Sequence, residues 1–297
     1  DLLTRALARE PEARFATARD MSNAIEALQQ SSLSAEAVEL DEDDLQALVD
    51  QLREDIGDDD IAAGIEALVG PARRWAVAAD IFTELASEGD DEGDDQPART
   101  QLMLRAARIY QQELRDDTKT EKTYRAILAL SPGHATAITA LEELYREGEA
   151  HENLLDLLLE RMESEQEASA RGRILREVAA LYEEPLEASD NALVAWTQAL
   201  IEDPTDTRAI AAVERLALDE NQWGEVLGTL NESAQENTDS PELAAGIYQR
   251  MGRWYADRLQ RLDFAVPCFT QALQLVPNYQ PAISALCEFY EKSEAWP

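Results

Sequence analysis

The sequence predicts an all-α fold, a right-handed superhelical solenoid in which antiparallel helix pairs follow one another along the chain. Glycine and proline are sparse, 12 and 11 in 297 residues, while Ala, Leu, Glu and Arg, which favour helices, fill long stretches. No run of residues shows the β-branched alternation that is typical of strands. Aromatic residues and prolines recur at a fixed interval, which is typical of a repeat protein.

The repeat is clearest in three segments that each begin at an aromatic residue and end at a proline eight positions later. Successive prolines are 72 and 73 residues apart, and three tyrosines upstream keep the same steps. This period fits two helix pairs of roughly 34–36 residues each. We expect the ring to fill the space between helices and the proline to end the helix. The segments and their tyrosines are Tyr124–Pro132 with Tyr110, Trp196–Pro204 with Tyr182, and Phe269–Pro277 with Tyr255.

The third segment and the helix before it carry small and aromatic residues at a specific spacing. Small residues let two helices approach closely, and the large rings pack between them. This pattern resembles the tetratricopeptide repeat, with one extra residue in the turn between the helices. The resemblance covers about residues 59–297 and implies a helical solenoid that binds proteins, without naming a ligand. The matching residues are Gly252, Tyr255, Ala265, Phe269, Ala272 and Pro277 in the third unit, Ala179, Tyr182, Ala192, Trp196, Ala199 and Pro204 in the second, and Ala107, Tyr110, Tyr124 and Pro132 in the weaker first.

The limits of the solenoid follow from the same register. Ile65 lies 73 residues before Ile138, which predicts a first helix near Asp59 and about thirteen helices from there onward. The acidic segment 88–95 is expected to be a solvated loop that lengthens one connection. Trp296 is expected to open a further helix, so we interpret the solenoid as truncated at its C-terminal end.

Residues 1–30 do not fit the repeat. Pro11, Arg14 and Phe15, with the apolar spacing after them, resemble the last two helices of a bacterial serine/threonine protein kinase domain. The resemblance implies that Arg14 pairs with a buried glutamate of that domain. An alternative is a helical hairpin that caps the solenoid. The chain contains no His-Arg-Asp, Asp-Phe-Gly or Ala-Pro-Glu motif, so no catalytic residue is assigned and this chain is not expected to be an enzyme.

Residues 31–58 are expected to be an acidic linker with a short helix over 43–56. Leu45, Val49 and Leu52 fit one helical face there. Asp58–Asp60 should begin the next helix, because carboxylates are stabilised by the free amides and the dipole at a helix start.

Charge and composition exclude several classes of function. The formal net charge of -35 repels phosphate backbones, so neither nucleic acid nor a membrane is an expected partner. Apolar runs are too short to span a bilayer and no signal peptide opens the chain, so a cytoplasmic location is expected. Cys268 and Cys287 do not form a disulfide framework, and His134 and His151 are isolated. No metal and no cofactor is expected.

Arginine placement is the feature that points to a binding site. The predicted first helices of the three clear pairs, roughly 97–115, 170–183 and 241–258, hold ten basic and five acidic residues, the reverse of the whole chain. In tetratricopeptide proteins these helices line the concave groove, so the resemblance implies a locally basic groove for an acidic segment or a free C-terminus. The alternative is that the arginines form ion pairs within and between repeats, such as Arg173 with Glu177. The candidate partner-binding residues are Arg108, Arg173, Arg176, Gln249 and Arg253.

These observations favour a protein–protein interaction scaffold, the regulatory or substrate-recruiting region of a larger bacterial signalling protein. The alternative is that the chain is a fragment of a serine/threonine protein kinase whose catalytic residues lie upstream of it.

Overall fold

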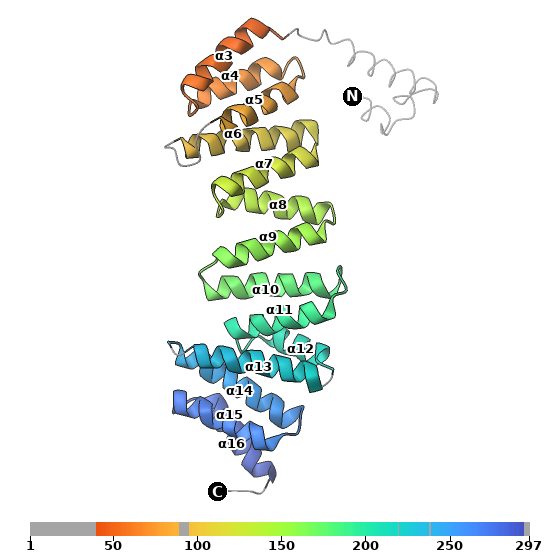
Figure 1. Cartoon of the computed structure of the whole chain (residues 1–297), viewed down its shortest axis with the longest axis vertical. Helices are drawn as coiled ribbons and strands as arrows, with labels where there is room; N and C mark the ends of the chain where they lie inside the picture. Colours follow the sequence, from red (N-terminus) through yellow and green to blue (C-terminus); the bar gives the residue numbers. More distant parts are fainter. Residues whose placement is uncertain (1–39, 89–94, 219, 238, 294–297) are drawn as a thin grey trace, which may run out of the picture. The chain divides into compact units, whose positions relative to one another are not determined.

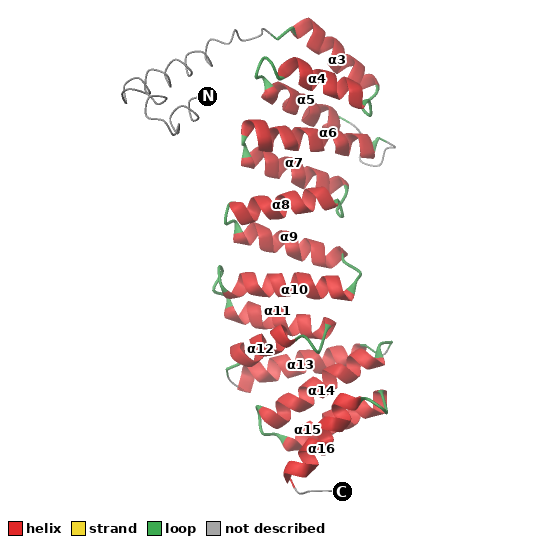
Figure 2. Ribbon diagram, turned by 180° about the vertical axis from the view of Figure 1, so that it is seen from behind, coloured by secondary structure: helices red, strands yellow, loops and turns green. Residues whose placement is uncertain are grey.

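The computed structural model describes residues 40–88, 95–218, 220–237 and 239–293. Within these ranges the chain is helical and contains no strand, which confirms the predicted all-α class (Figures 1 and 2). Apart from α5 (Trp75–Ser87) and α6 (Gln96–Ile109), short connections join consecutive helices, which form antiparallel pairs. Residues 1–30, and with them the prediction of a kinase-domain remnant, lie outside the described residues.

The chain divides into two compact units, residues 1–137 and 138–297. In its described part, the first unit contains the short predicted linker helix and then two helix pairs. The first helix of the second of these pairs ends in a π-helical turn. The elements are α3 (Glu42–Glu54), α4 (Asp59–Val69), α5 (Trp75–Ser87), α6 (Gln96–Ile109), η2 (Tyr110–Leu114) and α7 (Asp117–Leu130).

The second unit continues the same alternation of first and second helices. Helix α8 begins at the end of the first unit and lies mostly in the second. The elements are α8 (Ala135–Glu147), α9 (His151–Ser164), α10 (Ala168–Glu183), α11 (Ser189–Glu202), α12 (Thr207–Leu216), α13 (Glu220–Glu236), α14 (Pro241–Asp257), α15 (Leu262–Leu275) and α16 (Gln280–Ser293). From residue 59 on, the described ranges thus hold the thirteen predicted helices, while the right-handed sense of the superhelix stays a prediction.

The start of the solenoid confirms one prediction and corrects another. Helix α4 begins at Asp59, and Asp58 caps it by accepting hydrogen bonds from the amides of Asp60 (3.0 Å) and Ile61 (3.1 Å). The predicted register between α4 and α8 is wrong, because these helices begin 76 residues apart and not 73. The long connection between α5 and α6 accounts for the difference. The buried Ile65 therefore corresponds to the buried Leu141 and not to Ile138.

The repeat positions build the core and its turns. The rings of Tyr110, Tyr124, Trp196 and Phe269 are buried, while Tyr182 and Tyr255 are partly exposed. Gly252 is buried against Phe269, so close that a Cβ atom there would lie 2.5 Å from the ring. The prolines Pro132, Pro204 and Pro277 each follow the end of a second helix.

One turn geometry follows the first helix in five of the pairs between α4 and α15, the exception among the described residues being α12 and α13. A residue with left-handed φ lies in the turn after that helix, although none of these residues is glycine. In the three clear pairs, the carbonyl of the repeat tyrosine accepts a hydrogen bond from the amide six residues later, at 2.7–2.9 Å. The left-handed residues are Arg73, Arg115, Glu149, Glu187 and Gln260.

Candidate functional site

The five predicted partner-binding residues all lie on first helices. Arg108 lies on α6 in the first unit, and the other four lie in the second unit, Arg173 and Arg176 on α10, Gln249 and Arg253 on α14. Arg173 is exposed, and Gln249 is partly buried. The surroundings of these residues decide what they can bind.

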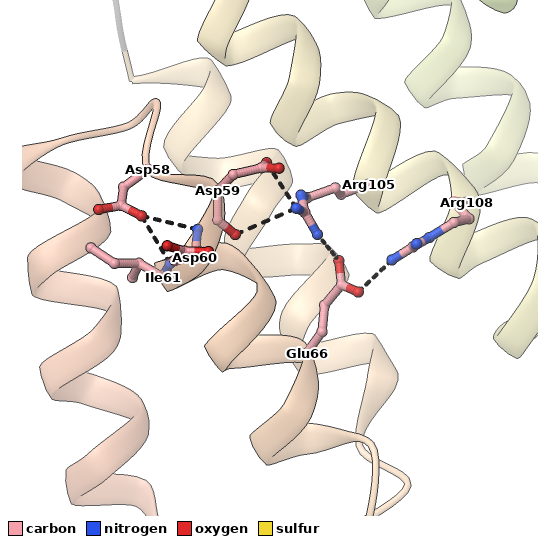
Figure 3. Close-up of polar contacts among 7 residues, drawn as sticks. All are labelled: Asp58, Asp59, Asp60, Ile61, Glu66, Arg105 and Arg108. Carbon is pink, nitrogen blue, oxygen red and sulfur yellow. Dashed lines mark hydrogen bonds and ion pairs between the residues drawn. The ribbon is translucent and has the colours of Figure 1, made fainter.

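In the first unit, Arg105 and Arg108 of α6 bind carboxylates of α4 (Figure 3). Glu66 accepts from Arg105 at 2.8 Å and also from Arg108, and its side chain is only 15% exposed. Arg105 reaches a second carboxylate, that of Asp59, at 2.8 Å. Burial by itself would lower the pKa of Arg105, but the hydrogen bonds to Asp59 and Glu66 outweigh burial and raise it. The chain thus satisfies this guanidinium internally.

In the second unit, ion pairs join each first helix to the next. They link α8 to α10, α10 to α12, α12 to α14 and α14 to α16. We call the surface that carries these pairs the first-helix face. The pairs are Arg146–Glu177 (2.5 Å), Arg176–Asp206 (2.7 Å), Arg215–Glu183 (2.5 Å), Arg258–Glu214 and Arg253–Glu288 (2.7 Å).

Asp206 has two roles on this face. One carboxylate oxygen caps α12 by accepting from the amides of Arg208 (2.9 Å) and Ala209 (3.2 Å), and the other accepts from Arg176 at 2.7 Å. Burial would raise the pKa of Asp206, but Arg176 and the two amides outweigh it and hold the pKa below its usual range. The carboxylate therefore stays charged while it ties α10 to α12.

The alternative prediction for the arginines is ion pairs between repeats. The structure shows such pairs for Arg108, Arg176 and Arg253. The example named with that prediction is wrong, because Glu177 accepts from Arg146 of the preceding first helix. Arg173 forms no ion pair with any residue that the structure describes. Whether the five residues contact a partner stays a prediction.

Sequence reasoning missed the carboxylates that hold the arginines, although the sequence contains their signal. A glutamate recurs eight residues after each residue that caps α4, α8 and α12. In each case it binds an arginine. His134 is one of the caps, since its Nδ1 accepts from the amide of Ala137 at 3.3 Å. The cap and glutamate pairs are Asp58 with Glu66, His134 with Glu142, and Asp206 with Glu214.

The described part of the chain offers little for chemistry that breaks bonds. It contains no group of three or more His, Cys, Asp or Glu that could hold a metal ion. Burial raises the pKa of the Cys268 thiol to about 11, so this thiol stays protonated near neutral pH. No described helix has the length and apolar character needed to cross a membrane. What the arrangement can do is present fixed guanidinium and carboxylate groups to a ligand.

No protein-family model matches the sequence, and no curated protein matches it. Among solved structures, the chain is similar to the C-terminal part of a TPR repeat-containing protein from Cytophaga hutchinsonii, with 10% identity, a TM-score of 0.34, and coverage of 82% of this chain and 93% of that one. It is also similar to a computationally designed self-assembling cyclic homo-oligomer, with 15% identity, a TM-score of 0.14, and coverage of 85% and 91%. Both likenesses are too weak to add to the description above.

Proposed function

We propose that this chain is a tetratricopeptide-type scaffold that binds a peptide segment of another protein along its first helices. The observation that carries the proposal is the run of ion pairs that joins successive first helices in the second unit. Each exposed pair contributes little stability, about 0–1 kcal/mol. Together they fix the orientation of neighbouring helices, and so form an extended surface with side chains in set positions.

The charge distribution supports a partner that brings carboxylates. The chain as a whole carries a formal charge of -35, which repels anionic ligands unless the local field is reversed. On the first helices, Arg173 is exposed with no acidic partner in the described ranges, and Arg108 is 48% exposed beside a single glutamate. A guanidinium can bind a carboxylate through two parallel hydrogen bonds. An acidic segment or a free C-terminus therefore fits these helices.

A peptide array tests the proposal directly. The probes are dodecapeptides of varied sequence, each made with and without acidic residues and with amidated or free C-termini. We expect binding to a subset with acidic residues, and a loss of about tenfold when Arg173→Ala is combined with Gln249→Ala. Arg261→Ala is the matched control, because Arg261 is exposed in the turn after α14 and pairs with the neighbouring Asp263. An array without any bound peptide would contradict the scaffold.

We also propose that the scaffold is the regulatory or substrate-recruiting region of a larger bacterial signalling protein. The spacing of Pro11, Arg14 and Phe15 supports this context, because it resembles the end of a kinase domain. Sequencing the natural gene upstream of Asp1 tests it. We expect a glycine-rich loop, a phosphate-binding lysine and a His-Arg-Asp motif there, and their absence would remove the kinase context and leave the scaffold untouched.

A further inference from the structure

Arg250 lies half-buried on α14. Arg176 and Arg253 are also half-buried on the first-helix face, and each forms an ion pair, whereas Arg250 forms none with the described residues. We propose that Arg250 binds one side-chain carboxylate, from an aspartate or glutamate, of the bound peptide. This inference rests on the proposed scaffold function and names one residue that determines its specificity. Arg250 is not among the five residues that the sequence singled out.

The guanidinium of Arg250 is half-buried, and the residues that the structure describes offer it no ion pair. Its Nε donates a long hydrogen bond, 3.4 Å, to the carbonyl of Pro204 in the turn before α12. No buried nitrogen or oxygen of a described side chain lacks a partner, so the two terminal nitrogens of Arg250 reach solvent. Burial lowers the pKa of Arg250. The nearby charge of Glu214 opposes that fall without forming an ion pair, and the charge of Arg253 adds to it. A ligand carboxylate would relieve both costs.

The first repeat shows what this position binds when the chain supplies the carboxylate itself. Arg105 and Arg250 correspond, because each lies five residues before the tyrosine of its repeat, Tyr110 or Tyr255. Arg105 holds the carboxylates of both Asp59 and Glu66, each at 2.8 Å (Figure 3). The first repeat thus contains an internal copy of the contact that we assign to a partner in the third.

In the third repeat, one of the two carboxylates is missing and the other binds different donors. The residue that follows the capping aspartate is Asp59 in α4 and Thr207 in α12. The recurring glutamate of α12, Glu214, is present but accepts instead from the indole Nε1 of Trp254 at 3.0 Å and from Arg258. Arg250 therefore keeps the arginine of the first repeat without its partners.

A second polar group lies beside the same turn of α14. Gly246, one turn before Arg250, lies between Pro204 and Tyr279. A Cβ atom at Gly246 would be 3.3 Å from Cγ of Pro204 and 3.4 Å from the hydroxyl of Tyr279. The phenol therefore lies close to α14. Burial raises the pKa of Tyr279, while the nearby charge of Arg250 opposes that rise. A neutral phenol can donate a hydrogen bond to a carboxylate that Arg250 holds.

The local charges favour a carboxylate over a phosphate. Glu214 and Glu288 form ion pairs with two of the three arginines on this side of α14, Arg258 and Arg253. Arg250 has no ion pair of its own in the described ranges and only shares the field of Glu214. One carboxylate compensates the charge of Arg250. A phosphorylated residue carries about two negative charges. It would leave an excess of negative charge beside Arg250, in a chain that is already strongly acidic.

Fluorescence anisotropy with labelled dodecapeptides tests this assignment. The probe is the tightest-binding amidated peptide of the array that has one internal glutamate. It is compared with two amidated forms, in which glutamine or phosphoserine replaces the glutamate, and with a glutamine form that has a free C-terminus. We expect the glutamate form to bind at least about tenfold more tightly than the other three. Arg250→Gln should abolish that difference, while Arg105→Gln, the matched change at a satisfied position, should leave the affinity within about twofold.

A second variant keeps the test valid if Arg250→Gln folds poorly. Thr207→Asp restores at α12 the carboxylate that α4 has at Asp59, so it should occupy Arg250 and lower the affinity for the glutamate peptide about tenfold. Thr207→Asn is its uncharged control and should not. Three results would overturn the inference. They are equal affinity of Thr207→Asp and Thr207→Asn for the glutamate peptide, equal affinity of the wild type and Arg250→Gln for it, and equal affinity of the wild type for the glutamate and glutamine peptides. Tighter binding of the phosphoserine or the free-C-terminus form would also overturn it. All of these outcomes leave the scaffold function standing, whereas an array without binders removes the scaffold as well.

Discussion

The first repeat, with α6 and α7, and the third, with α14 and α15, share their aromatic positions and the turn between their helices, yet they use the same arginine differently. Arg105 forms ion pairs with two carboxylates of its own chain, while Arg250 forms none with the described residues and has only the nearby charge of Glu214. The difference lies in α4 and α12, the preceding first helices, and not in the repeat pattern. Repetition therefore copies the packing, and single differences outside the repeat pattern decide which arginines form ion pairs within the chain.

The two repeats also differ in how closely their helices approach, and this difference should give the largest effect. The position of Ala107 in the first repeat is Gly252 in the third, where a Cβ would lie 2.5 Å from the ring of Phe269. Gly252→Ala should destabilise the second unit by about 1–3 kcal/mol through overpacking. Urea denaturation followed by circular dichroism measures it.

Gly228→Ala is the control for that experiment. Gly228 lies on α13, and a Cβ there would meet nothing within 4 Å. Alanine should stabilise that helix by about 0.5–1 kcal/mol. If Gly252→Ala also stabilises the protein, the close approach of α14 and α15 is wrong.

Exchanging the two arginines for glutamine sharpens the comparison further. Arg105→Gln should cost about 1–2 kcal/mol, because Asp59 and the largely buried Glu66 lose a charged partner. Arg250→Gln should change stability by less than about 0.5 kcal/mol, since it removes a desolvated charge that has no ion pair within the described ranges. Urea midpoints of both variants measure the contrast. Equal losses would mean that Arg250 has an internal partner after all.

Local rules predicted much of this fold from the sequence. Asp58 was placed at a helix start because a carboxylate there accepts from free amides, and the structure shows those two hydrogen bonds. The buried rings of Trp196 and Phe269 were predicted from their spacing, since large side chains must fill the gap between helices. These features depend on neighbouring residues only, so a pattern of residues is enough to predict them.

The arginine partners could not be predicted in the same way, because they depend on which residues of different helices come together. The spacing of Arg173 and Glu177 suggested a pair on one helix, but Glu177 binds Arg146, 31 residues earlier. The register of Ile65 failed for a related reason, because the longer connection between α5 and α6 changes the period without changing the helices. The recurring glutamate after each cap carried the missing information, and recognising it required the caps to be known first.

The shared carboxylate of Asp206 gives a prediction on pH. Its pKa in the folded chain is held below the usual value of about 3.9. Its contribution to stability is therefore present above that usual value and is lost as the pH falls through the lower, folded pKa. Arg176→Gln should cost about 1 kcal/mol near pH 7, and the cost should shrink towards zero as the pH falls through the lowered, folded pKa of Asp206.

Urea midpoints across this pH range measure the effect of Arg176→Gln. Arg208→Gln is the control, because Arg208 is exposed and gives Asp206 only its backbone amide. A cost that stays constant from neutral to acid pH would show that Arg176 acts through packing and not through the charge of Asp206.

The smallest expected effect comes from making the third repeat resemble the first. Thr207→Asp should stabilise the contact between α12 and α14 by about 0.5 kcal/mol, because it supplies Arg250 with the carboxylate that Arg105 finds in Asp59. An aspartate at the first position of a helix also gains about 0.3–1 kcal/mol from the helix dipole, without any contact to Arg250. A double-mutant cycle with Arg250→Gln separates the two contributions, because the dipole effect remains in both backgrounds while the ion pair does not. Hydrogen exchange of the α14 amides is the suitable measurement, since in a repeat protein it reports the local opening that a global denaturation curve averages. A coupling energy of zero would show that Thr207 and Arg250 do not meet, and that the third repeat departs from the first in geometry as well as in charge.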